Sequence, residues 1–597
     1  MIFNPLDKFF KSVIGAVSDN ETLTYRVKGN FGSVILRIKK DGEDYVEYKM
    51  TDKCGFYEIQ LNLSVGLYFY HFSLNDGNFI GLNDKYVGEL THAPQDFQLT
   101  VYSNDYLVSE NVYGGIIYQI FPDRFYRSKP LKDIEKGKTY HENWHEMPQF
   151  LPVNGKVLNN DFFGGDLQGI RLKLGFLKEL GVTYIYLNPI FKAYSNHRYD
   201  TGDYMQIDPI LGDESDLLDL INSANKFGIS IILDGVFNHT GSDSVYFNKN
   251  GNYNSVGAYQ SKNSPYYSWY DFTDYPNKYE CWWGIETLPN VVETNPKYVE
   301  FITGKDGVIE HYTKLGISGW RLDVVDELPD FFVEKIRNSV KRNNKDSILI
   351  GEVWEDATNK IAYDTRKHYF LGKQLDSVMN YPLRNAIIDF VKNGNVEAMA
   401  YVIKEQIDHY PKKSLNALMN ILSTHDTYRI ISALSDVDVN GMTKTQMSKI
   451  RLNEPEYAEA VFKAKIATLL QFTLYGVPSI YYGDEIGMEG YCDPLNRQTY
   501  KWENVNCEIF DWYKFLSKLR QEYSLFEQGE VQEIYAKRSC YIFKRYDEKS
   551  QILVAVNLGE NSIDLAYDGV LCNLIDGEHY PNECELKSNS YYIFVAC

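Results

Sequence analysis

The chain has 597 residues, which is more than a single hydrophobic core organises, so about three or four domains are predicted. A hydrophobic content of 44% and a charged content of 24% are ordinary for a globular protein. The formal charge of −20 argues against a polyanionic partner, so neither nucleic acid nor an anionic membrane surface is expected to bind.

The N-terminal sequence predicts a cytoplasmic protein. The longest apolar run near the start, Val13–Val17, is too short for an export signal, and no stretch of the chain approaches the length of a membrane span. The eight cysteines form no Cys-x-x-Cys pair and no zinc-binding spacing. In the absence of an export signal, free thiols in the cytoplasm are the simplest interpretation.

The two ends of the chain are predicted to be all-β. In residues 1–108, the segments Val34–Ile38 and Leu67–Phe72 alternate apolar with polar residues and are separated by Gly, Asn and Asp turns, as in a β-sandwich. In residues 521–597, three segments read as strands of a closing all-β domain: Cys540–Arg545, Ile552–Asn557 and Tyr591–Val595.

The region 109–520 alternates predicted strands with amphipathic helices such as Leu217–Phe227 and Phe331–Lys341. Eight strands are predicted: Gly115–Phe121, Thr183–Asn188, Ser230–Asp234, Gly319–Val324, Ile348–Val353, Leu375–Asn380, Asn420–His425 and Ser479–Tyr482. Eight such units predict an α/β fold, a (β/α)8 TIM barrel. The third connection, at about 240–290, is rich in Tyr, Asn, Ser and Gly and is predicted to be an inserted subdomain.

Aromatic residues make up 15% of the chain, including 49 Tyr. A tyrosine can stack its flat apolar face on a sugar ring, or it can fill a hydrophobic core. The sequence leaves both uses open.

Titratable groups gather where the predicted barrel strands end, which is where such barrels place their active sites. The third predicted strand ends with Asp234 and His239, and the fourth with Arg321 and Asp323. The fifth ends with Glu352, and the seventh with His425 and Asp426. Buried carboxylates are costly unless they are paired, so a purely structural role for all of them is hard to sustain.

Two of these carboxyl groups suit glycoside hydrolysis, which needs one carboxylate to attack and a second carboxyl to donate a proton. Arg321 and Asp323 share one face of the predicted strand, so we expect the arginine to lower the pKa of the aspartate. Apolar Ile350 and Val353, with Trp354 nearby, favour a protonated Glu352. A strand-end ion pair is the plainer alternative for Arg321 and Asp323. A zinc hydrolase is disfavoured because neither His-x-His nor His-Glu-x-x-His occurs.

The chain resembles the α-amylase superfamily of retaining glycoside hydrolases (glycoside hydrolase family thirteen), and within it the neopullulanase, cyclomaltodextrinase and maltogenic amylase group. Four signature regions occur in order: Asp234–His239, Gly319–Glu327, Gly351–Trp354 and Asn420–Asp426. Supporting blocks are Phe163–Ile170, His197–Thr201 and Gly476–Glu485. The resemblance is strong over about 110–520, and the flanking domains match by arrangement, the first being similar to carbohydrate-binding sandwiches.

The resemblance implies a role for each matching residue. Asp323 matches the nucleophile, Glu352 the general acid/base and Asp426 the third carboxylate of the catalytic set. The substrate-binding positions are matched by His197, Tyr199, Asp234, His239, Arg321, Glu327, Trp354, His425, Asp493 and Arg497.

Three departures from the group bear on specificity and metal binding. Val324–Glu327 reads Val-Val-Asp-Glu where the group has Val-Ala-Asn-Glu, so the preference between α-1,4 and α-1,6 bonds stays open. The group's Met-Pro-Lys-Leu block appears as Leu288–Val291, Leu-Pro-Asn-Val, without the lysine. The stretch Tyr126–Lys132, where the group has a calcium loop, carries Arg127, Lys129 and Lys132. We therefore expect no required cofactor and regard calcium as doubtful, although Asp166 remains.

The predicted partners are α-glucans: maltooligosaccharides, cyclodextrins, pullulan or starch fragments. One alternative is a glucan transglycosylase, which differs in whether water or a sugar takes the glycosyl group. Another is a non-catalytic carbohydrate-binding protein, which the intact carboxylates disfavour. The resemblance also implies a homodimer formed through the N-terminal domain.

Overall fold

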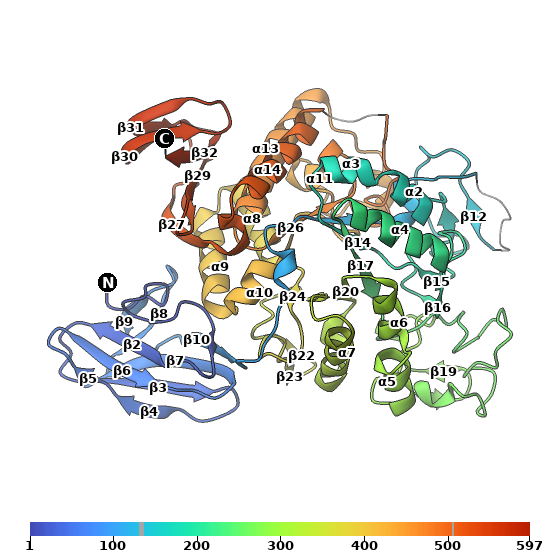
Figure 1. Ribbon diagram of the computed structural model, residues 1–597, viewed down its shortest axis with the longest axis horizontal. Coiled ribbons are helices and arrows are strands. Elements are labelled where there is room, and N and C mark those ends of the chain that lie inside the picture. The colour runs from blue at the N-terminus through green and yellow to red at the C-terminus, as the bar shows by residue number, and fades with distance from the viewer. Residues whose placement is uncertain (131–136, 504–506, 597) are drawn as a thin grey trace. The chain divides into compact units, whose positions relative to one another are not determined.

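The computed structural model describes residues 1–130, 137–503 and 507–596 (Figure 1). The chain divides into two compact units, each built from separate stretches of sequence. The first unit comprises Met1–Glu110, Val353–Leu418 and Gly529–Cys597, and the second comprises Asn111–Glu352 and Met419–Gln528. The chain therefore leaves the second unit after Glu352 and returns to it at Met419.

A parallel sheet forms the centre of the second unit. Its strands are β11 (Ile117–Ile120), β14 (Tyr184–Leu187), β17 (Ser230–Gly235), β20 (Gly319–Leu322), β21 (Ile348–Gly351), β25 (Met419–Ile421) and β26 (Val477–Tyr481). They lie in the order β21-β20-β17-β14-β11-β26-β25, and every pair is parallel. With β24 (Ser377–Val378), which belongs to the first unit, the chain supplies the eight strands of the predicted (β/α)8 barrel, and that fold class is confirmed.

The helices of the second unit follow the expected local signals. Helix α4 (Glu214–Lys226) begins at a capping box in which the Asp213 side chain accepts a hydrogen bond from the Asp216 backbone. Its apolar residues bury one face, so the helix packs against β17 and against α2 (Leu167–Leu172) (Figure 1). The other helices are α1 (Pro122–Phe125), α3 (Leu174–Glu179), α5 (Pro296–Thr303), α6 (Val308–Leu315), α7 (Asp330–Asn343), α11 (Ile430–Leu434), α12 (Lys444–Met447), α13 (Glu454–Thr473), α14 (Cys507–Glu522) and α15 (Leu525–Gln528).

Strand β20 ends two residues earlier than predicted, at Leu322, so Asp323 and Val324 are not part of the strand. The reason is the backbone of Val324, which has φ 41° and ψ 45°. This left-handed conformation is unfavourable for a β-branched residue. It turns the chain into the short 3-10 helix η4 (Val325–Glu327) immediately after Asp323.

The connection between β17 and β20 contains little regular structure and is packed with aromatic rings. Its elements are η2 (Tyr267–Trp269), β18 (Phe272–Asp274), β19 (Lys278–Tyr279) and η3 (Trp282–Gly284). The rings of Tyr246 and Trp269 stack with centroids 5.3 Å apart, and those of Phe247 and Phe272 stack at 5.8 Å. Tyr246 and Tyr270 are buried, so these tyrosines serve as core residues.

The N-terminal part of the first unit consists of two sheets around one core. One sheet has the order β1-β10-β7-β3-β4, with β8 and β9 added beside β7, and the other has the order β2-β6-β5. Buried Tyr25, Tyr70 and Phe97 belong to the hydrophobic cluster that both sheets share. The strands are β1 (Val17–Ser18), β2 (Leu23–Lys28), β3 (Val34–Lys40), β4 (Val46–Lys49), β5 (Thr51–Asp52), β6 (Phe56–Leu61), β7 (Gly66–Leu74), β8 (Phe79–Leu82), β9 (Gly88–Thr91) and β10 (Phe97–Tyr102).

The remainder of the first unit combines three helices with a C-terminal sheet. The helices are α8 (Tyr381–Asn393), α9 (Val396–His409) and α10 (Lys412–Ala417). The sheet has the order β27-β28-β29-β32-β30-β31, with strands Glu530–Lys537, Cys540–Tyr546, Gln551–Asn557, Ser590–Ala596, Ile563–Asn573 and His579–Leu586. Within this unit, Lys11 pairs with Asp408 of α9 at 2.5 Å, and both side chains are fully buried.

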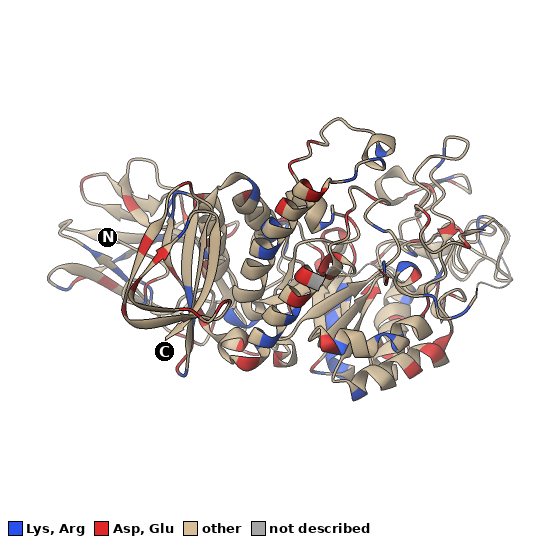
Figure 2. Ribbon diagram, turned by 90° about the horizontal axis from the view of Figure 1, so that it is seen from above, with Lys and Arg blue, Asp and Glu red and all other residues tan. Residues whose placement is uncertain are grey.

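The surface charge is mixed. Figure 2 shows acidic and basic positions interspersed along the helices, although acidic residues outnumber basic ones, 81 to 61. Within the described part of the chain, none of the helices combines the length and the apolar character that crossing a membrane requires.

Candidate active site

A single guanidinium group gathers three carboxyl groups at the ends of neighbouring strands. Nη1 of Arg321 donates to Oδ1 of Asp234 at 2.9 Å and to Oδ1 of Asp323 at 2.7 Å. Its Nη2 lies 2.7 Å from Oε2 of Glu352. Arg321 and Asp234 are fully buried, and Asp323 and Glu352 are less than a tenth exposed. Three carboxyl groups around one cation form the electrostatic centre of the site.

The sheet register produces this cluster. In the pairing of β17 with β20, Asp234 lies opposite Arg321, and in the pairing of β20 with β21, Leu322 lies opposite Gly351. The residues that follow those last two, Asp323 and Glu352, therefore leave adjacent strands side by side. Because of the turn at Val324, its backbone N–H donates to Oε2 of Glu352 at 3.2 Å.

Arg321 acts on Asp323 in the expected direction, because it lowers the pKa of that carboxyl, but the expected net result of a low pKa is wrong. Burial raises the pKa of the Asp323 carboxyl well above its usual range. Arg321 opposes this rise, but the negative charges of Glu352 and Asp234 reinforce it, so the increase prevails. Arg321 has to balance three carboxyl groups at once, so its single charge does not offset the effect of burial at Asp323.

A second polar cluster surrounds Asp426. Its Oδ2 lies 3.0 Å from Nε2 of His425, and its Oδ1 accepts from Nη2 of Arg497 at 3.2 Å. Nη1 of Arg497 also pairs with Asp493 at 2.8 Å. Burial raises the pKa of Asp426, but His425 and Arg497 outweigh burial and hold it well below its usual range. Asp426 and Asp323 thus have pKa values displaced in opposite directions.

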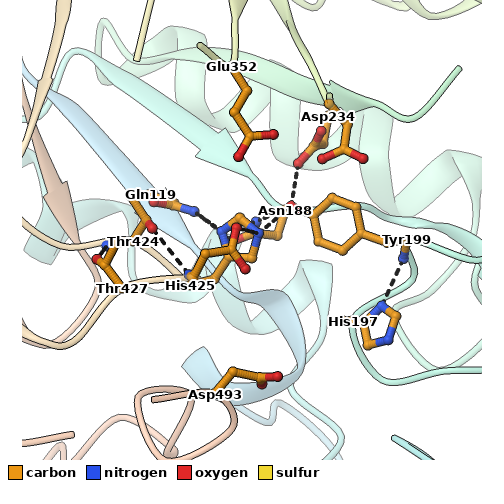
Figure 3. A network of polar contacts seen from close by, with 12 residues as sticks. Gln119, Asn188, His197, Tyr199, Asp234, Glu352, Thr424, His425, Thr427 and Asp493 are labelled. Carbon is orange, nitrogen blue, oxygen red and sulfur yellow. Dashed lines mark hydrogen bonds and ion pairs between the residues drawn. The ribbon is translucent and has the colours of Figure 1, made fainter. Parts of the chain in front are cut away.

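Tyr199 connects the two clusters. Its hydroxyl donates to Oδ2 of Asp234 at 2.9 Å and lies 2.6 Å from Nε2 of His425 (Figure 3). Its ring stacks on the His425 imidazole with a centroid distance of 5.2 Å and an interplanar angle of 7°. The backbone N–H of Tyr199 donates to Nδ1 of His197 at 3.1 Å, so His197 supports Tyr199 from the side away from Asp234 (Figure 3).

The two remaining predicted histidines are held in the neutral form. Burial lowers the pKa of His197 to about 3 and that of His239 to about 4. His239 is 2% exposed, and its Nε2 has no hydrogen-bond partner among the described residues. A neutral imidazole with one free ring nitrogen suits hydrogen bonding to an uncharged polar ligand.

Three residues that hold this site together were not predicted. Gln119 and Asn188 direct their side-chain amides at Nδ1 of His425, at 3.0 and 3.2 Å, so the Nε2 of His425 carries its hydrogen. Tyr186 donates to Oδ2 of Asp234 at 2.6 Å. Gln119 and Tyr186 lie within largely apolar strands, and Asn188 follows one directly. A polar residue that interrupts or ends an apolar strand sequence is the signal that could have identified them.

The last two predicted residues lie apart from these clusters. Glu327 ends the 3-10 helix η4 and accepts hydrogen bonds from two indole groups, those of Trp282 and Trp283. Trp354 belongs to the first unit, where its ring stacks on Tyr381 at 3.7 Å. Of the predicted residues, Arg321 contacts Asp234, Asp323 and Glu352. Arg497 contacts Asp426 and Asp493.

Two closely held carboxyl groups of this kind suit reactions at a sugar acetal carbon. Asp323 offers a carboxylate held by Arg321, and Glu352 offers a second carboxyl group on the adjacent strand end. Two carboxyl groups of this kind can divide the roles of nucleophile and general acid/base. Around them, Asp426, His425 and Tyr199 supply hydrogen-bonding groups and an aromatic face for a sugar ring.

Comparison with known proteins agrees with this geometry. A sequence profile of the alpha-amylase catalytic domain matches residues 119–509. The chain therefore belongs to the alpha-amylase family.

Its relatives include an amylopullulanase of Thermoanaerobacter thermohydrosulfuricus, 34% identical over 605 residues, with 90% of this chain and 40% of that protein covered. A cyclomaltodextrinase of Thermoanaerobacter pseudethanolicus is 32% identical over 557 residues, and the alignment covers 90% of this chain and 87% of that protein. A solved cyclomaltodextrinase structure matches with a TM-score of 0.72 and 25% identity, covering 98% of each chain. The chain spans between a third and just under half of the length of the amylopullulanases it matches.

The opposite pKa shifts of two site carboxyls predict opposite effects on stability. Because the folded-state pKa of Asp323 is raised, the folded state holds a proton that the unfolded state has lost, from about pH 3.9 up to that raised pKa. Wild-type stability therefore falls as pH rises through this window, and Asp323→Asn avoids the loss. We expect the Tm of Asp323→Asn at pH 8 to rise by about 2–4 °C, the shift that about 1 kcal/mol gives in a domain of 150–250 residues.

Asp426→Asn is the matched control for this measurement. Its folded-state pKa is lowered, so its charge stabilises the fold above the unfolded-state pKa, and removing it should lower the Tm at pH 8. Calorimetry at pH 8 and pH 4.5 should show the Asp323→Asn difference shrinking at the lower pH, whereas the Asp426→Asn difference should persist, because pH 4.5 still lies above the unfolded-state pKa of about 3.9. A lower Tm for Asp323→Asn at pH 8 would contradict the burial argument.

Proposed function

We propose that the protein is a retaining α-glucan hydrolase that cleaves α-1,4 glucosidic bonds. The observation that carries this proposal is the shared Arg321, which holds Asp323 and Glu352 at adjacent strand ends. Family membership supports the same reaction class. Asp323 is the nucleophile, Glu352 the general acid/base and Asp426 the third carboxylate.

The contacts of each carboxyl group assign its reacting atom. Oδ1 of Asp323 accepts from Arg321, which leaves Oδ2 for attack on the anomeric carbon. Oε2 of Glu352 accepts from Val324 N–H and lies beside Arg321, which leaves Oε1 to carry the proton. Attack by Asp323 breaks the glycosidic bond while Glu352 protonates the leaving oxygen. Glu352 then takes a proton from water, which displaces Asp323.

The surrounding groups position the sugar ring. Tyr199 and His425 present stacked rings between the two clusters, and Asp426 is fixed by His425 and Arg497. The low pKa of Asp426 keeps it a strong acceptor for sugar hydroxyls, so its hydrogen bonds can strengthen as charge develops on the sugar.

The substrates we propose are maltooligosaccharides, cyclodextrins, pullulan or starch fragments, with α-1,6 bonds as a further target. The relatives named amylopullulanase, cyclomaltodextrinase and neopullulanase support this range. A glucan transglycosylase remains the alternative, since the same intermediate can react with a sugar hydroxyl instead of water. The ratio of glucose and maltose to longer products, measured on maltotriose, separates the two reactions.

The first test is the configuration of the product. We expect NMR of early hydrolysis products from maltotriose to show the α-anomer, because two displacements at one carbon restore the configuration. Asp323→Asn should lose several powers of ten in kcat, and Glu352→Gln should lose a similar factor on substrates with poor leaving groups. Early release of the β-anomer, or near-normal turnover by Asp323→Asn, would refute the mechanism.

We also propose that activity needs no calcium. The expected calcium stretch Arg127–Lys132 is only partly described, since Leu131 and Lys132 lie outside the described residues. The nearby Asp166 is occupied as the N-cap of α2: it accepts from Gly169 N at 2.5 Å and from Ser128 Oγ at 2.8 Å. Among the described residues, a different group could hold a metal, namely Asp356, Glu405 and His409 in the first unit.

Chelation tests this proposal directly. We expect full activity on maltotriose after dialysis against EDTA, because hydrogen-bond donors and cationic side chains occupy the position of the calcium loop. The Tm measured in parallel reports any structural metal elsewhere. Loss of activity that calcium restores would contradict the proposal.

We further propose that the N-terminal sandwich forms a homodimer and restricts the substrate to short or cyclic glucans in the cytoplasm. None of the proposed catalytic residues lies in residues 1–105, and the six described cysteines without a disulfide, Cys54, Cys281, Cys492, Cys540, Cys572 and Cys584, suit a reducing compartment. The alternative is a monomer whose sandwich binds starch or covers the side of the barrel.

Deletion of residues 1–105 should convert two chains to one in light scattering. It should also raise activity on starch relative to cyclodextrin, because an interface next to the active site would be removed. Full-length protein that is already monomeric at micromolar concentration would rule out the dimer.

A further inference from the structure

The imidazole ring of His425 meets amide groups at one nitrogen and oxygen atoms at the other. The side-chain amide nitrogens of Gln119 and Asn188 lie 3.0 and 3.2 Å from its Nδ1 (Figure 3). Its Nε2 lies 2.6 Å from the Tyr199 hydroxyl and 3.0 Å from Oδ2 of Asp426. Because a neutral imidazole carries one hydrogen, the nitrogen that holds it decides which of these contacts are favourable.

The hydroxyl group of Tyr199 places that hydrogen on Nε2. Oδ2 of Asp234 accepts hydrogen bonds from Tyr186 at 2.6 Å and from Tyr199 at 2.9 Å. Oδ1 of the same carboxylate accepts from Arg321 at 2.9 Å. A carboxylate only accepts hydrogen bonds, so Tyr199 gives its single hydrogen to Asp234. The short contact between Tyr199 and His425 therefore needs a hydrogen from Nε2.

The two amide groups lead to the same tautomer. The amide nitrogen of Gln119 also donates to Oδ1 of Asn188 at 3.1 Å, and that of Asn188 also donates to the Tyr199 hydroxyl at 3.0 Å. Turning both amides over would require the hydrogen on Nδ1 of His425. The single hydrogen of Tyr199 would then face three acceptors, those of Asn188, His425 and Asp234. The Nε2–H tautomer instead pairs a donor with an acceptor at each of these contacts.

Gln119 lies where a polar side chain is unfavourable. It belongs to strand β11, whose four residues are all buried, and is itself fully buried. Its Oε1 has no hydrogen-bond partner among the described residues. A buried polar group without a partner destabilises a fold, and an apolar residue of similar size would avoid this cost. The cost is accounted for if the N–H groups of Gln119 serve the site.

We propose that Gln119 and Asn188 are positioning residues that hold His425 as its Nε2–H tautomer. The hydrogen on Nε2 in turn holds Asp426 and Tyr199 in place for the sugar ring. In the other tautomer, a lone pair on Nε2 would face the Asp426 carboxylate and repel it. This inference rests on the proposed glucan hydrolase function and adds the groups that orient its third carboxylate from behind the histidine.

The position of the hydrogen can be measured without any reaction. In protein labelled with nitrogen-15 histidine, we expect His425 to show a protonated Nε2 and an unprotonated Nδ1 at pH 7. Its signals are assigned by their loss in His425→Gln. Gln119→Glu replaces the donor at Nδ1 with an acceptor and should place a hydrogen on that nitrogen. A hydrogen on Nδ1 of the wild-type protein, or unchanged signals in Gln119→Glu, would overturn the proposal.

Gln119→Met tests the effect on the reaction, because methionine has a similar length and no N–H donor. We expect kcat on maltotriose to fall about 10–100-fold, the range known for groups that orient metal-binding histidines. KM should stay nearly unchanged, since an interaction that strengthens only in the transition state acts on kcat. Asn188→Leu should change kcat in the same direction. A higher KM with normal kcat would contradict the positioning role.

Gln406→Met is the matched control. Gln406 is a buried glutamine of the first unit, and it exchanges hydrogen bonds of 2.7 and 3.0 Å with the buried Asn380. Its replacement should lower the Tm, as Gln119→Met does, but leave kcat and the His425 signals unchanged. Equal losses of kcat in the two variants would show that the amide acts through stability alone and would refute the positioning role.

The outcomes separate this proposal from the wider function. If wild-type protein does not hydrolyse maltotriose, the hydrolase proposal fails, while the spectrum still reports the tautomer of His425. If wild-type protein hydrolyses maltotriose and Gln119→Met keeps its kcat, only the positioning role is refuted. The wild-type spectrum needs no variant at Gln119, so it decides the tautomer even where Gln119→Met does not fold.

Discussion

The contacts of Arg321 are the constraint on which the rest of the site depends. One buried guanidinium group faces Asp234, Asp323 and Glu352, so the positive charge cannot balance all three carboxylates at once. Burial raises the pKa of Asp323, and the negative charges of Glu352 and Asp234 add to that rise. Removing Arg321 would leave three buried carboxyl groups in contact, which is costly unless they become protonated.

The same region shows how function is obtained at the expense of local backbone stability. Val324 adopts a left-handed conformation, which costs of the order of 1–3 kcal/mol for a residue of this type. The turn that it makes directs its own N–H at Glu352 and brings Glu327 to the two indoles. A strand that continued through Val324, as the sequence pattern predicts, would have pointed alternate residues to opposite faces and lost both contacts.

Much of the fold and the centre of the site could be predicted, because both depend on regular strands. Polar residues that follow apolar strands stand out in the sequence, which is how Asp234, Asp323, Glu352 and Asp426 were selected as candidates. The direction of the Asp323 pKa shift could not be predicted, since it depends first on how deeply the carboxyl is buried and then on charges from two other strands as well as on Arg321. Gln119 was missed because it lies inside an apolar strand. The tyrosines illustrate the same limit, since many of them fill cores that a composition count cannot distinguish from binding surfaces.

The division of the chain into two units bears on how the protein folds during synthesis. Strand β11, near residue 120, pairs with β26, near residue 480, so the central sheet lacks a neighbour until most of the chain has been made. The first unit likewise draws on residues from both ends of the sequence. The central sheet therefore cannot be completed early in synthesis, whereas the core of the N-terminal sandwich, drawn from residues 3–101, is made first. Such long-range pairing makes folding slow and leaves apolar strands exposed meanwhile, which favours association with chaperones while the nascent chain is still growing.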